Sequence, residues 1–241
     1  IKTECKNNPL DFIQISISFG LATKESKDVN LIDLYKKAES NMYHNKLAES
    51  KAAKLSIIKF LTHKLEKETT ETIAHFERLN KLSQLVGNAL NIPEIEKRRL
   101  KLLCQYHDVG TVAIPIEILN KKDALNKNEW EIVKGHCESG YHIITAFRET
   151  LVIDELILMH HERWDGRGYP RNIKGKDIPE VVRIFSIADA YESMVNDRPY
   201  RNKMTCTQAL KVIEAEAVKQ FDPDMAALFI NIMEKGHAKA I

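Results

Sequence analysis

Nine histidines occur in this chain of 241 residues, and five of them stand where metal binding explains them better than packing does. The five are His75, His107, His136, His160 and His161. His75 falls on the same predicted helix face as Leu79, Leu82 and Val86, so its imidazole is expected to be buried. The other four stand at or near the ends of apolar helical segments. Imidazole is the commonest metal ligand in proteins.

Three carboxylates accompany these histidines. Glu71 precedes His75 by one helical turn on the same face, and Asp108 directly follows His107. Asp189 interrupts a segment, VRIFSIADAYESMV, whose other side chains on that face are apolar. An unpaired buried carboxylate costs several kcal/mol or more, so Asp189 must be neutralised, paired or bound to a cation.

Each of these residues taken alone has an ordinary explanation, as a hydrogen-bonded core histidine or an aspartate in a turn. One site with two metal ions accounts for all of them together, with Asp108 shared. The predicted ligands of one ion are His75, His107, Asp108 and Asp189, and those of the other are Asp108, His136, His160 and His161. Glu71 remains for a third ion. This donor set, which includes no thiolate, suits iron, manganese, nickel or zinc.

The remaining histidines and the cysteines are given no chemical role. His44, His63, His142 and His237 are predicted to be surface or packing residues. Cys5, Cys104, Cys137 and Cys206 show no CxxC spacing, which fits a reducing compartment, and they are interpreted as thiols in packing roles.

The pattern of the chain predicts a mainly α fold. Residues 13–22 alternate as a half-buried strand would, and from about Leu31 the apolar residues recur at helical spacing. Helices are predicted up to Asn91, up to Tyr106, from about 126 to 136, and over the ranges 139–147, 151–161, 180–195, 205–220 and 223–235. A long loop with three glycines over residues 162–180 is predicted to be functional.

Composition limits the partners and the location. The net charge of +2 gives no reason to expect binding to duplex nucleic acid or to a membrane surface. No apolar run reaches the roughly 20 residues of a membrane span, and no signal peptide is recognisable, so a cytoplasmic location is expected. Because the chain begins with Ile, it is interpreted as a piece of a longer protein.

Several motifs together resemble the HD-GYP family, a branch of the metal-dependent HD phosphohydrolases. The motifs, spread from about Thr69 to Phe229, are ETIAH, YHDVG, IPIEILNKKDALNKNEWEIVKGH, HHERWDGRGYP, IPEVVRIFSIADAYESM, NDRPYR and FDP. The resemblance implies a helical HD-domain bundle, two or three divalent metal ions with iron or manganese favoured, and hydrolysis of cyclic di-GMP to pGpG or GMP. The hydrolytic water would be activated as a metal-bridged hydroxide.

The resemblance also assigns roles to individual residues. The family's metal ligands fall on the eight histidines and carboxylates already named, with His107 and Asp108 as the catalytic pair. Its substrate contacts fall on Gly168, Tyr169, Arg198 and Arg201. One departure is Thr111 in HDVGT, because the family usually has lysine at that position.

The N-terminal part resembles something else, the C-terminal end of a GGDEF domain, although the GGDEF motif is absent. The predicted organisation is a GGDEF-like fragment over 1–50, a helical linker over 51–68 and the HD-GYP domain over 69–241. A homodimer through the N-terminal helix and an upstream sensor or GGDEF region missing from this chain are further expectations. An isolated strand needs a partner, so residues 13–22 are expected to be disordered, folded back or swapped with another chain.

The function predicted on these grounds is that of a cyclic di-GMP phosphodiesterase. One alternative is a cyclic dinucleotide receptor with weak or no turnover, which Thr111 would favour. A second is a phosphohydrolase acting on another nucleotide, and a third is a purely structural helical domain, which would leave Asp189 unexplained.

Overall fold

The computed structural model describes residues 18–24, 30–46, 56–57, 73–121, 123–147, 152–197 and 202–235. The chain divides into two compact units, Ile1–Lys59 and Phe60–Ile241. Three residues with predicted roles, Glu71, Arg198 and Arg201, lie outside the described residues. Their roles therefore stay predictions.

The described part of the first unit contains a helix over 31–46, where helical spacing was predicted to begin. The strand predicted over 13–22 is described only from residue 18 onward, and residues 18–22 form no strand. Their backbone carbonyls are bound by the helix instead, because Asn41 Nδ2 donates to Leu21 O at 2.9 Å and Asn45 Nδ2 to Phe19 O at 2.8 Å. Side-chain amides here satisfy backbone groups that a neighbouring strand would otherwise pair.

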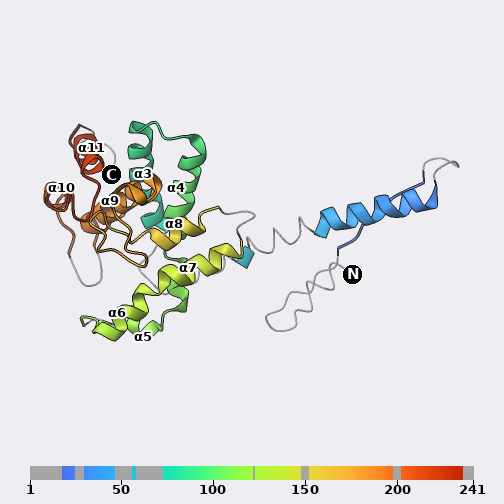
Figure 1. The fold of residues 1–241 in the computed structure, drawn as a ribbon, viewed down its shortest axis with the longest axis horizontal. Helices are drawn as coiled ribbons and strands as arrows, with labels where there is room; N and C mark the ends of the chain where they lie inside the picture. Colours follow the sequence, from blue (N-terminus) through green and yellow to red (C-terminus); the bar gives the residue numbers. More distant parts are fainter. Residues whose placement is uncertain are drawn as a thin grey trace. The chain divides into compact units, whose positions relative to one another are not determined.

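The regular elements of the second unit are helices in the part that the structure describes, which confirms the mainly α prediction (Figure 1). Its α-helices are α3 Ile73–Ala89, α4 Glu94–Tyr106, α5 Ile116–Leu119, α6 Lys127–Lys134, α7 His136–Thr145, α8 Asp154–Met159, α9 Glu180–Val195, α10 Cys206–Ala215 and α11 Pro223–Lys235. Two short 3-10 helices, η1 Val109–Ala113 and η2 Gly175–Asp177, complete the described elements. No helix in the described residues is long and apolar enough to cross a membrane.

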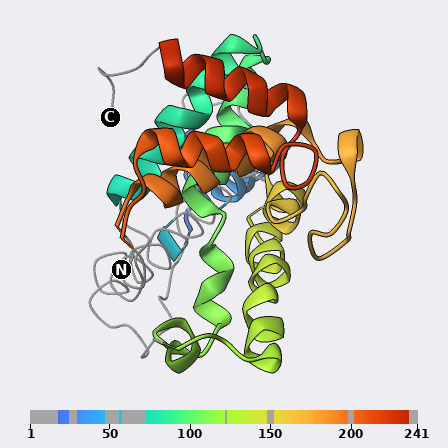
Figure 2. The same cartoon turned by 90° about the vertical axis from the view of Figure 1, so that its left-hand side faces the viewer.

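Helix α9 is the centre of this unit and packs against α3, α4, α10 and α11. It is apolar nearly all round, with Val182, Ile184, Phe185 and Ala188 buried, and such a helix belongs inside a core. Figure 2 shows these helices gathered at one end of the unit, while α5 and α6 lie at the far end of α7. Ser186, Asp189 and Ser193 of α9 line a cavity.

A close backbone contact fixes η1 against α7. A Cβ added to Gly110 would lie 2.0 Å from the carbonyl oxygen of His136 and 2.4 Å from the backbone nitrogen of Gly140. Only glycine leaves room for this approach. The contact places the turn that carries His107 and Asp108 beside the first residue of α7.

Candidate metal centre and its cavity

The candidate site is built from helix ends that converge on one point. His107 and Asp108 follow α4, His136 is the first residue of α7, and His160 with His161 follows α8. Helix termini suit this purpose because adjacent residues there can direct their side chains to a common centre. His75 from the first turn of α3 and Asp189 from the middle of α9 complete the set.

Two clusters of side chains have ligand atoms within 4.8 Å of one another. The first cluster consists of His75, His107 and Asp189, and the second consists of His136, Cys137, His160 and His161. The structure therefore brings together every predicted ligand that it describes. It also adds one that the sequence did not suggest, Cys137.

Asp108 lies between the two clusters. Its Oδ2 is 3.3 Å from His107 Nε2, whereas its Oδ1 is 3.5 Å from His136 Nε2 and 4.0 Å from His160 Nε2. The two oxygens of one carboxylate thus face different clusters. This is the arrangement that a carboxylate shared by two ions requires.

The hydrogen bonds of the histidines test whether the site suits metal ions. Three of the histidines direct Nδ1 at a backbone carbonyl oxygen. The distance is 3.2 Å from His107 to Cys104 O, 2.6 Å from His136 to Val133 O, and 2.5 Å from His160 to Ile157 O. Because a carbonyl only accepts, Nδ1 carries the hydrogen and the lone pair of the neutral ring is on Nε2. The Nε2 atoms of His136 and His160 then face each other at 3.1 Å. Two facing lone pairs repel unless a cation lies between them, so the donor set fits a metal ion.

Glu192 contacts a candidate metal ligand, and the sequence analysis gave it no role. It is buried, and its Oε2 accepts from His75 Nδ1 at 2.7 Å while its Oε1 accepts from Arg78 Nε at 2.7 Å. Burial raises the pKa of Glu192, but the hydrogen bonds and charges of His75 and Arg78 outweigh it and bring the pKa below its usual value. The carboxylate orients His75 so that Nε2 points to the first cluster. The signal available in the sequence was its position three residues after Asp189 on the same helix.

We expect Glu192→Gln to weaken metal binding by about 10- to 100-fold, the usual effect of losing the carboxylate behind a metal-bound histidine. Titration of the metal-free protein against a competing chelator measures the affinity. Glu180→Gln, an exposed residue at the start of the same helix, is the matched control. Equal affinities of the two variants would show that Glu192 does not support the site.

Burial keeps His160 and His161 neutral. It lowers the pKa of His160 well below the usual 6.5, and the neighbouring His161 and His136 lower it further. Burial and His136 likewise lower the pKa of His161 to about 3. For Asp108, burial raises the pKa, but His107, His136 and His160 outweigh it and hold the pKa well below 3.8. Neutral imidazoles around an ionised carboxylate are the protonation states that metal ligation needs.

The metal-free protein is expected to lose stability as pH falls below about 6.5. In the window between the unfolded value near 6.5 and the folded value of about 3 for His161, the unfolded chain binds more protons than the folded chain. The free energy of unfolding then falls by up to about 1.4 kcal/mol per pH unit for each such histidine. Urea unfolding at pH 7.5, 6.5 and 5.5 measures the slope. A flat profile would mean that these histidines can be protonated in the folded state.

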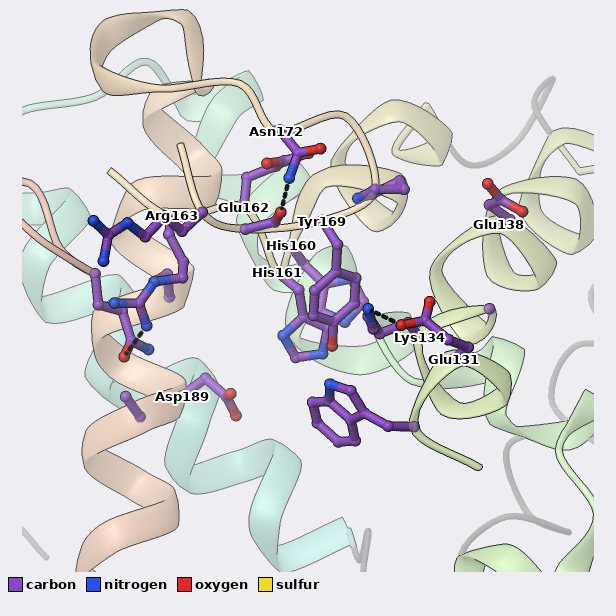
Figure 3. A pocket seen from close by; sticks show the side chains of 18 of the residues that line it. Glu131, Lys134, Glu138, His160, His161, Glu162, Arg163, Tyr169, Asn172 and Asp189 are labelled. Carbon is purple, nitrogen blue, oxygen red and sulfur yellow. Dashed lines mark hydrogen bonds and ion pairs between the residues drawn. The ribbon is translucent and has the colours of Figure 1, made fainter. Parts of the chain in front are cut away.

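A cavity of 830 Å³ opens onto both clusters. Its wall includes His160 and His161 from the second cluster and Asp189 from the first. Figure 3 shows Asp189 projecting from α9 toward the part of the cavity where His161 and Tyr169 lie. Asp189 is half-buried, so the prediction of a deeply buried aspartate is corrected: this carboxylate is at the edge of a cavity, where part of its charge is solvated.

The GYP segment forms one rim of this cavity. The Tyr169 ring packs on that of His161, with centroids 4.9 Å apart and planes inclined by 30°. A Cβ on Gly168 would lie 2.4 Å from the backbone nitrogen of Arg163, so glycine is needed for the chain to fold back on residues 161–163. Gly168, which the sequence analysis predicts to be a substrate contact, thus has a structural role as well.

The rest of the long loop is fixed to the turn between α10 and α11. The backbone nitrogens of Trp164 and Asp165 donate to the carbonyls of Gln220 and Lys219, at 3.1 and 2.8 Å. Buried Glu162 accepts from the backbone nitrogen of Arg171 at 2.7 Å. These bonds hold the GYP segment in place over the cavity.

Thr111 contributes no charge to the site. Its hydroxyl donates to the carbonyl oxygen of Asp108 at 2.7 Å and so closes the first turn of η1. The cavity wall does carry a cation, Lys134. Its Nζ is 5.9 Å from the centre of the Tyr169 ring and 2.6 Å from Glu131 Oε1 (Figure 3).

Of the histidines predicted to have no role, His44 and His142 are exposed. His63 and His237 lie outside the described residues.

Comparison with known proteins agrees with this architecture. A profile of the HD domain matches residues 57–225. The chain is 32% identical over 178 residues to a cyclic di-GMP phosphodiesterase from Thermotoga maritima, a match that covers 73% of this chain and 48% of the relative. It is 31% identical over 188 residues to the 3'3'-cGAMP-specific phosphodiesterase 2 of Vibrio cholerae, covering 77% of this chain and 36% of the relative.

The solved structure of an HDG"Y"P protein from Bdellovibrio bacteriovorus shares the fold, with a TM-score of 0.56 at 16% identity over 88% of this chain and 75% of that one. The chain therefore belongs to the HD-domain family. Its HD domain is of the HD-GYP type. The chain spans about half or less of the length of the curated relatives described above.

Proposed function

We propose that this chain carries a cyclic dinucleotide phosphodiesterase that hydrolyses cyclic di-GMP to pGpG, to GMP or to both. The observation that carries the proposal is the pair of ligand clusters joined by Asp108 at the wall of an 830 Å³ cavity. The similarity to phosphodiesterases of cyclic di-GMP and of 3'3'-cGAMP supports this class of substrate.

The residues of the chain would share the work as follows. His75, His107 and Asp189 would hold one divalent ion, and His136, His160 and His161 another, with Asp108 between them and Glu71 available for a third. Such ions, when bound, activate a water and neutralise the charge of a phosphodiester. Glu192 keeps His75 oriented, and the carbonyls of Val133 and Ile157 keep His136 and His160 oriented. Because water is the nucleophile, no serine or cysteine nucleophile is needed.

The cavity rim would bind the nucleotide. Tyr169, held against His161, offers an aromatic face, and Gly168 shapes the turn beneath it. Lys134, whose Nζ is 5.9 Å from the centre of the Tyr169 ring, offers a positive charge for a phosphate. Arg198 and Arg201 would add guanidinium groups, which suit phosphates and guanine edges. Residues 1–50 remain proposed as the end of a GGDEF-like domain, joined by 51–68 to the catalytic domain.

Turnover of cyclic di-GMP and 3'3'-cGAMP by the purified chain tests the proposal. The protein is incubated with each nucleotide under Mn²⁺, Fe²⁺, Zn²⁺ or Ni²⁺, and the products are separated by chromatography. We expect linear products that depend on the metal. Metal-loaded protein that neither binds nor hydrolyses either nucleotide would overturn the proposal.

Thr111 favours a second candidate, a receptor that binds a cyclic dinucleotide and turns it over poorly. Its hydroxyl is bound within η1, so this position supplies no cation to the substrate. Binding measured by calorimetry on the same preparation separates the two: tight binding without product would indicate the receptor.

A further inference from the structure

Cys137 lies inside the candidate metal centre. It is fully buried, and its Sγ is 3.6 Å from His136 Nε2 and 3.9 Å from His160 Nδ1. Cys137 follows His136 directly at the start of α7, just as His161 follows His160 after α8. The chain thus presents two adjacent pairs of potential ligands to the same cluster.

The distance between Cys137 and His136 suits two ligands of one ion. With a metal–sulfur bond of about 2.3 Å and a metal–nitrogen bond of about 2.0–2.1 Å, a tetrahedral angle places sulfur and nitrogen about 3.5 Å apart. The observed distance from Cys137 Sγ to His136 Nε2 is 3.6 Å, and His136 Nε2 is 3.1 Å from His160 Nε2. One ion can therefore contact Cys137 Sγ and His136 Nε2 together, and the ligand atoms of the whole second cluster lie within 4.8 Å of one another.

We propose that Cys137 is a thiolate ligand of the ion in the second cluster, which would consequently prefer Zn²⁺, Co²⁺ or Fe²⁺ to Mn²⁺. Thiolate ligands select such softer ions, whereas carboxylate and water suit Mn²⁺. The first cluster, His75, His107 and Asp189, contains no sulfur. The two halves of the centre are thus chemically different, and each has its own order of metal preference. The inference rests on the metal centre of the proposed function and not on its substrate.

The competing explanation is a buried thiol that merely donates a weak hydrogen bond to His136 Nε2, which 3.6 Å also permits. The two differ in what happens when metal is added. If Cys137 is a ligand, its sulfur bonds to the ion. If Cys137 is only a hydrogen-bonding thiol, His136 binds the ion and the thiol keeps its proton.

Absorption spectra of the Co²⁺-loaded chain distinguish these explanations. A sulfur ligand gives an intense near-ultraviolet charge-transfer band, and nitrogen and oxygen ligands do not. We expect the band in the wild type and in a Cys5→Ser/Cys206→Ser control, and its loss in Cys137→Ser. Chelator competition should show a drop of at least about 10-fold in Zn²⁺ affinity for Cys137→Ser, while Mn²⁺ affinity changes much less.

X-ray absorption of the Zn²⁺-loaded wild type provides a measurement that needs no variant, so it decides the matter if Cys137→Ser fails to fold. A sulfur neighbour at about 2.3 Å supports the inference, and a shell of nitrogen and oxygen alone overturns it. If the wild type binds Zn²⁺ or Co²⁺ without sulfur, only this inference fails. If it binds no ion at all, the proposed function fails with it.

Discussion

Replacing Asp108 with alanine is expected to lower phosphodiester hydrolysis by at least about 10³-fold. Among the described residues, Asp108 is the one carboxylate that faces both clusters. The metal ions it would hold supply several kcal/mol of transition-state stabilisation, and each 1.4 kcal/mol corresponds to about a factor of ten in rate. The fold should survive. The contribution of Asp108 to η1 is its backbone carbonyl, which accepts from Thr111, and alanine keeps that group.

Three measurements on Asp108→Ala make this prediction decisive: turnover, bound metal per chain by mass spectrometry, and circular dichroism. Asp177→Ala, an exposed aspartate in η2, is the control and should match the wild type in all three. Wild-type turnover by a folded Asp108→Ala protein would show that the two clusters are not the catalytic centre.

Removing the metal ions is expected to abolish hydrolysis and to lower the melting temperature by about 5–10 °C. At a free metal concentration 100 times the dissociation constant, binding stabilises a fold by about 2.7 kcal/mol, and for a chain of this size each kcal/mol is worth roughly 2–4 °C. Without ions, the facing nitrogens of His136 and His160 repel each other.

Dialysis against a chelator, followed by return of one metal at a time, tests this expectation. Zn²⁺, Fe²⁺ or Mn²⁺ should restore the melting temperature, whereas Mg²⁺ should not, because imidazole-rich sites bind it poorly. Full activity in protein shown to contain almost no metal would refute the metal-dependent mechanism.

The sequence alone determined the class of the fold and most of the centre. Helical spacing predicted where α9 and α11 begin and end, and it placed His75 on the buried face of α3. The candidate ligands could be found because histidines at apolar helix ends are unusual, and because their order along the chain resembles one family. Residue types and the helical spacing of apolar residues are enough for such predictions, because these predictions depend only on residues within a few helical turns of one another.

Only the tertiary structure decided which side chains meet. The local sequence around Cys137 and Glu192 does not reveal their partners, because helical spacing reports the face of one helix and not what that face meets. Glu192 reaches His75 across 117 positions of sequence, and Cys137 reaches His160 across 23. Those contacts depend on how α3 packs on α9 and how closely α7 approaches α8, where a Cβ added to Gly140 would lie 2.9 Å from Cγ2 of Ile157. Packing of helices to within a few tenths of an ångström is a property of the whole core, and for that reason no single segment could reveal it.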